Sequence, residues 1–116
     1  MALKSTEVKL ISEAIKKGGA IIFEYYPNKT ENVTLKGDRI CLAINLFKSN
    51  GKFYFFGYFL SGSSVSKGIG YRLYFQKGMY NVRNTSVRLN FSTILKIKLF
   101  AKFEQVKLLF SKKIES

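Results

Sequence analysis

The chain of 116 residues is long enough for one domain with a single hydrophobic core. Hydrophobic residues make up 47% of it and aromatic residues 16%, which excludes general disorder. Twenty Lys and Arg residues against seven Asp and Glu residues give a formal net charge of +13. Between Arg39 and Phe103 there are eleven basic residues and no acidic one, and this charge favours a polyanionic partner.

The first predicted element is an amphipathic helix over residues 1–18. Apolar residues recur there at helical spacing, and Gly18 with Gly19 ends the pattern. Ser5 or Thr6 is the expected N-cap. A strand is predicted over residues 20–26, and a second, short strand over residues 33–35.

The most aromatic stretch of the chain, residues 51–60, predicts a buried strand. The pair Asn50-Gly51 directly before it is typical of a β-hairpin turn, so we expect it to pair with the apolar run 39–47. A buried tyrosine hydroxyl needs a hydrogen-bond partner, so the face with more tyrosines is expected to be the wetter, working face. Alternation along the strand places on one face Phe53, Phe55 and Phe59, and on the other Tyr54, Phe56, Tyr58 and Leu60.

The second half of the chain predicts further strands. Residues 61–68 are typical of a mobile loop, and short strands are predicted over residues 69–76, 79–82 and 86–91. Every odd position from Leu95 to Phe103 is apolar, which favours a strand there. Beyond Glu104 both helix and strand fit the pattern.

These elements predict a mainly β, α+β fold in a single domain over residues 1–116. The N-terminal helix (1–18) packs on a strongly bent antiparallel sheet of at least five strands (20–92), followed by a basic strand or helix extension (93–116). The core is expected to contain Ile22, Phe53, Phe55, Phe59, Leu73 and Phe75.

The order of motifs over about residues 10–80 resembles the WYL domain. A helix runs into the strand 21–25, then come the aromatic strand and the segment Gly70-Tyr71-Arg72-Leu73-Tyr74. The Trp-Tyr-Leu tripeptide of the family would fall on residues 53–55, and its Arg-x-Phe strand on residues 72–74. The resemblance implies a small Sm-like β-barrel and a nucleic-acid-binding or ligand-sensing regulatory role without catalysis.

The residue types argue independently against an enzyme. The chain has no histidine, the commonest general base, and its seven carboxylates are scattered. Cys41, the single cysteine, has no imidazole partner and cannot form an internal disulfide. We therefore predict no catalysis and no cofactor. Without a signal-peptide pattern or an apolar run of about 18 residues, we expect a cytoplasmic protein that does not enter a membrane.

The predicted function is binding of single-stranded DNA or RNA, or of another polyanion, in a regulatory or accessory role. Tyrosines of two neighbouring strands would stack on bases, and with Arg72 they would form one exposed platform. The stacking residues are predicted to be Tyr54, Tyr58 and Tyr74. The residues predicted to hold phosphates are Lys52, Arg72, Lys77, Arg83 and Arg88.

Two alternatives stay open at this point. In the first, the same aromatic residues simply fill a barrel core. In the second, the protein is a protein-interaction module, an inhibitor or accessory subunit that acts on a nucleic-acid-processing complex.

Overall fold

The computed structural model describes residues 3–27, 37–63 and 68–115. The predicted short strand over residues 33–35 lies outside them, and the loop 61–68 lies only partly within them. The elements, in chain order, are α1 (Ser5–Lys17), β1 (Ala20–Tyr25), β2 (Arg39–Ser49), β3 (Lys52–Gly62), β4 (Gly70–Phe75), the 3₁₀ turn η1 (Gln76–Gly78), β5 (Met79–Asn84) and α2 (Phe91–Phe110).

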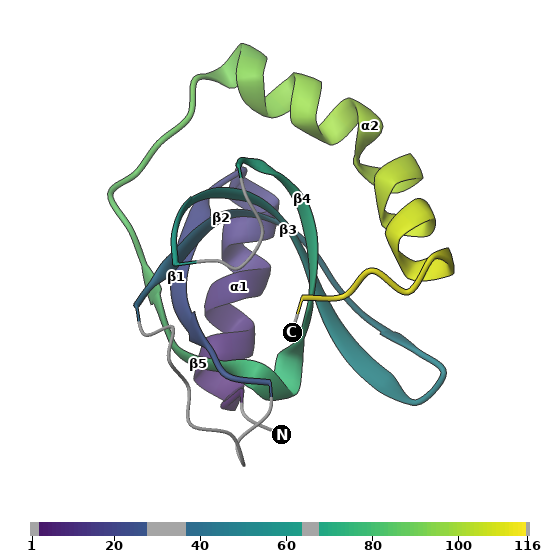
Figure 1. Cartoon of the computed structure of the whole chain (residues 1–116). Helices are drawn as coiled ribbons and strands as arrows, with labels where there is room; N and C mark the ends of the chain where they lie inside the picture. The colour runs from purple at the N-terminus through teal and green to yellow at the C-terminus, as the bar shows by residue number, and fades with distance from the viewer. Residues whose placement is uncertain (1–2, 28–36, 64–67, 116) are drawn as a thin grey trace.

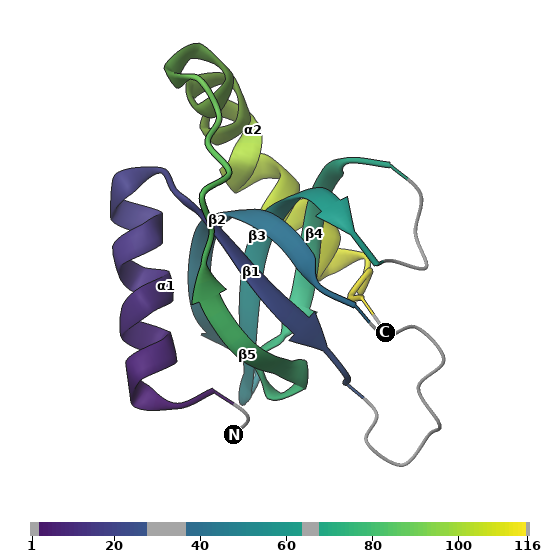
Figure 2. The same ribbon diagram turned by 90° about the vertical axis from the view of Figure 1, so that its left-hand side faces the viewer.

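The five strands form one antiparallel sheet in the order β4-β3-β2-β1-β5. Strands β4 and β5 lie at opposite edges of the sheet, yet only the three residues of η1 join them. The sheet must therefore curl until its edges approach, and Figures 1 and 2 show this strong curvature, with α1 on one side of the sheet. The predicted mainly β fold, with a helix packed on a strongly bent antiparallel sheet, is confirmed.

Helix α1 ends as predicted but begins differently. Gly18 adopts φ 67°, the left-handed conformation that ends helices. Lys4, and not Ser5 or Thr6, occupies the N-cap position, and its backbone N–H donates to the Glu7 carboxylate at 3.0 Å. The other oxygen of Glu7 accepts from the Val82 N–H at 2.8 Å. Glu7 therefore caps α1 and also fastens it to β5.

The predicted Asn-Gly hairpin is confirmed. Asn50 and Gly51 both have positive φ, 50° and 77°, and they join β2 to β3 with Ser49 opposite Lys52. The pairing shifts between Ala43 and Asn45, where Gly57 faces β2. A Cβ on Gly57 would lie 3.0 Å from the Leu42 carbonyl oxygen, so a side chain there would disturb the close approach at this bulge.

Both faces of β3 are buried, against different partners. Phe55 and Phe59 belong to an inner core, which α1 helps to form through Ile11. Tyr54 and Phe56 belong to an outer cluster that includes Leu108 and Leu109 of α2. The prediction that Phe55 and Phe59 lie on one face of β3 and residues 54 and 56 on the other is thus confirmed. The face with Tyr54, expected to be exposed, is instead covered by α2.

Three expected core residues differ from the prediction. Phe53 is 40% exposed because it lies beside the hairpin turn, and Ile22 and Phe75 are only half-buried. Phe55, Phe59 and Leu73 are buried as expected.

The strands predicted over residues 86–91 and 95–103 are wrong. Residues 91–110 form the single helix α2, which begins where the Asn90 side chain accepts from the Thr93 N–H at 2.8 Å. The apolar odd positions are shared between two helix faces: Ile97 and Ala101 face the sheet, whereas Leu99 and Phe103 face outward. Neither helix within the described ranges is long and apolar enough to cross a membrane.

Candidate nucleic-acid interface

The expected tyrosine platform is not present. Strands β3 and β4 are neighbours, as predicted, but their register pairs Tyr54 with Phe75 and Tyr74 with Phe55. Directly paired residues share a face, so Tyr54 and Tyr74 lie on opposite faces of the sheet. Both are buried, with 5% and 0% of their surface exposed. They cannot stack on a base in this fold.

The two tyrosines instead organise the two apolar layers. Tyr54 stacks on Phe47 in the outer cluster, with ring centroids 5.3 Å apart. The Tyr74 ring lies edge-on to Phe23 at 5.2 Å in the inner core. Tyr58 is half-buried and meets the Tyr71 ring edge-on at 4.9 Å, on the outer face. The core alternative is therefore correct for Tyr54 and Tyr74.

The predicted arginines are separated from one another. Arg72 is 7% exposed, and its Nη1 donates to Glu115 Oε1 at 3.0 Å. Arg83 is half-buried and forms an ion pair with Asp38, Nη2 to Oδ1 2.7 Å. Arg88 is exposed and lines a hollow of about 260 Å³ between the end of α1 and the segment after β5. The three do not form one phosphate track.

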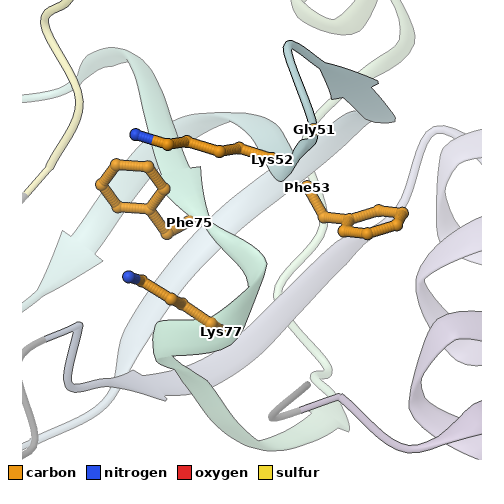
Figure 3. Close-up of a pocket in the computed structure, with 5 residues that line it drawn as sticks. All are labelled: Gly51, Lys52, Phe53, Phe75 and Lys77. Carbon is orange, nitrogen blue, oxygen red and sulfur yellow. The ribbon is translucent and has the colours of Figure 1, made fainter.

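Two predicted residues do come together. Lys52 follows the hairpin turn, Lys77 lies in η1, and their ammonium groups lie 5.8 and 5.4 Å from the centroid of the Phe75 ring. With Gly51 and Phe53 they line an open pocket of about 170 Å³, here called the lysine–phenyl pocket (Figure 3). Both lysines are exposed, and their attraction to the ring contributes only about 0.5–1 kcal/mol each at such a site.

A third lysine lies on the other face of the hairpin end. The Lys48 ammonium lies 5.2 Å from the Phe53 ring centroid, and Lys48 pairs with Phe53 in the register. Phe75 pairs with Tyr54, the neighbour of Phe53, so the rings of Phe53 and Phe75 lie on opposite faces and Lys48 does not line the lysine–phenyl pocket. A pocket of about 170 Å³ is smaller than most sites for whole small molecules and suits a single phosphate or base. Cations beside aromatic faces are the groups that bind single-stranded nucleic acid.

Phe75 is the residue of this site that the sequence does not reveal. Its aromatic side chain predicts a core position, whereas in the structure it is half-buried between Lys52 and Lys77. The Asn50-Gly51 turn carries a signal for Lys52 alone, because it fixes this lysine at the exposed end of β3.

Cys41 shows no sign of nucleophilic chemistry. Its side chain is fully buried, and burial raises the pKa of the thiol to about 12, against a weaker lowering effect of its contact with the Tyr74 hydroxyl. A neutral, buried thiol is unreactive at physiological pH.

No protein-family model and no curated protein matches the chain.

Proposed function

We propose that this protein is a non-enzymatic, cytoplasmic, WYL-like small domain that binds single-stranded nucleic acid or another polyanion in a regulatory or accessory role. The observation that carries the proposal is the lysine–phenyl pocket, where Lys52 and Lys77 lie beside the accessible ring of Phe75. The formal charge of +13 supplies the long-range attraction. The absence of histidine from the sequence and the neutral thiol of Cys41 support a binding role over catalysis.

The double variant K52Q/K77Q, in which glutamine replaces both lysines, is expected to bind a single-stranded oligonucleotide more weakly. If each lysine neutralises one phosphate, the slope of log K against log [salt] should become shallower by about 0.7 for each lysine replaced. Fluorescence anisotropy at several salt concentrations measures both quantities.

The matched control is the double variant K9Q/K16Q. Both residues are exposed on α1, so this variant loses the same charge without touching the pocket. Equal weakening in the two double variants would show that bulk charge alone attracts the strand, and the pocket assignment would fail. Parallel titrations with single-stranded DNA, RNA and heparin separate nucleic-acid binding from general polyanion binding.

A second candidate function, protein interaction, is favoured by the outward face of α2. That stripe is composed of Leu95, Leu99, Phe103, Val106 and Phe110, which are 51%, 75%, 71%, 60% and 89% exposed. Helical periodicity places Lys98 and Lys102 along one border of the stripe and Lys96 and Lys107 along the other. Apolar anchors between basic borders fit a groove with an acidic rim on an acidic protein partner.

Leu99→Ser is expected to abolish retention of such a partner from an extract of the host while leaving the thermal stability unchanged. The control Ile69→Ser alters another exposed apolar residue, which is 65% exposed and lies directly before β4. If both variants retain the same proteins as the wild type, α2 does not form an interface.

A further inference from the structure

Two arginines are buried at the end of the curled sheet that the C-terminus reaches. Arg39, at the start of β2, is 4% exposed, and its guanidinium lies 5.0 Å from the Tyr25 ring centroid. Arg72 of β4 is 7% exposed and lies 4.4 Å from the Phe59 ring centroid. Buried cations are destabilising unless anions and hydrogen bonds compensate them.

The carboxylate of Glu115 forms ion pairs with both arginines. Its Oε1 accepts from Arg72 Nη1 at 3.0 Å but lies 3.9 Å from Arg39 Nη1, too far for a hydrogen bond. Arg39 Nη1 is buried and has no hydrogen-bond partner within the described part of the chain. Among the described residues, these ion pairs thus set two guanidinium groups against the carboxylate of Glu115, and Arg39 Nη1 forms no hydrogen bond there.

The carboxylate comes from the last segment of the chain, which follows α2 and turns back. Figure 1 shows the C-terminus returning to the curled sheet. The backbone of Glu115 donates its N–H to the Leu73 carbonyl at 2.8 Å and accepts from the Tyr25 hydroxyl at 2.6 Å. Just before it, Lys112 and Lys113 are exposed. The bond to Leu73 therefore reports whether Glu115 is seated at the arginines.

We propose that Arg39 and Arg72 form a binding site for a phosphate group, which the Glu115 carboxylate occupies until a phosphate-bearing ligand displaces it. A phosphate dianion balances two guanidinium charges, and its additional oxygens offer Arg39 Nη1 the acceptor that Glu115 does not reach. The site is separate from the lysine–phenyl pocket and does not depend on its function. The group recognised is a phosphate monoester, on a free nucleotide or at the end of a nucleic-acid strand.

Glu115→Gln tests this competition with inorganic phosphate as the probe. If the Glu115 carboxylate leaves the arginines open about a tenth of the time, the loss of this carboxylate in E115Q should tighten phosphate binding about tenfold in calorimetric titration. Phosphate should also raise the melting temperature of E115Q more than that of the wild type. The control E13Q changes the same charge on an exposed position of α1 and should match the wild type. Adding Arg39→Gln to E115Q should remove the gain. Equal phosphate affinity in E115Q and the wild type would overturn the proposal.

A measurement on the unaltered protein covers the case in which E115Q does not fold. Phosphate should accelerate hydrogen exchange of the Glu115 amide, since displacement breaks its bond to Leu73, whereas sodium chloride of equal ionic strength should not. Unchanged exchange at saturating phosphate would also overturn the proposal. Nucleoside monophosphates and oligonucleotides with and without a 5′-phosphate then distinguish the two sources. Acceleration by the 5′-phosphorylated strand but not by the unphosphorylated one indicates a strand end, and acceleration by the nucleoside monophosphate alone indicates a free nucleotide.

Discussion

Replacing Phe55 with alanine is expected to lower the free energy of unfolding by about 3–5 kcal/mol. Phe55 is fully buried in the inner core, where its ring stacks near Tyr74 at 6.0 Å and lies edge-on to Phe23 at 5.8 Å. The strands around it are joined in one sheet, so the cavity left by the ring cannot collapse without moving several of them. Urea denaturation followed by circular dichroism gives the change, provided that the transition is two-state.

The matched control is Phe53→Ala, which removes the same atoms two residues earlier in β3. Phe53 is 40% exposed beside the hairpin turn, so this change should cost less than about 1 kcal/mol. If the two variants lost similar stability, the division of β3 between a buried centre and an exposed end would be wrong.

Stability is expected to fall as the pH rises above about 9. The Cys41 thiol has an ordinary pKa of 9.0, and burial raises it to about 12 in the folded protein. Between these values the unfolded chain has released a proton that the folded chain retains, so stability is intact below about pH 9 and declines above it. The decline for one such group is about 1.4 kcal/mol for each pH unit.

Two buried tyrosines should steepen this decline at still higher pH. Burial raises the pKa of Tyr25 and of Tyr74 well above the ordinary value of 10.0, so both must also ionise upon unfolding in base. Urea denaturation between pH 7 and pH 11 tests both effects, the thiol below pH 10 and the tyrosines above it. In Cys41→Ala the slope between pH 9 and pH 10 should become shallower, and an unchanged slope would show that the thiol does not contribute.

The candidate site could be predicted from the sequence only in part. Lys52 and Lys77 were both expected to bind a polyanion, on charge alone. The ring between them, Phe75, is half-buried, whereas Phe55 is fully buried. In the sequence both are phenylalanines of aromatic strands, so only the position of each ring in the folded sheet shows which one a ligand can reach. Arg72 looked like a surface cation because its partner, Glu115, lies 43 residues away in the chain.

The sequence by itself determined the features that depend on a few neighbouring residues. The helix end at Gly18, the Asn50-Gly51 turn and the alternation along β3 follow from backbone sterics and local hydrogen bonds. The tertiary structure alone decided the relation of β3 to β4, since a shift of one residue in the register moves a side chain to the other face. It also decided that residues 95–103 are helical. A pattern of period two can supply an apolar face to a helix as well as to a strand, and in the folded chain the helix buries the apolar side chains on the outer face of the sheet.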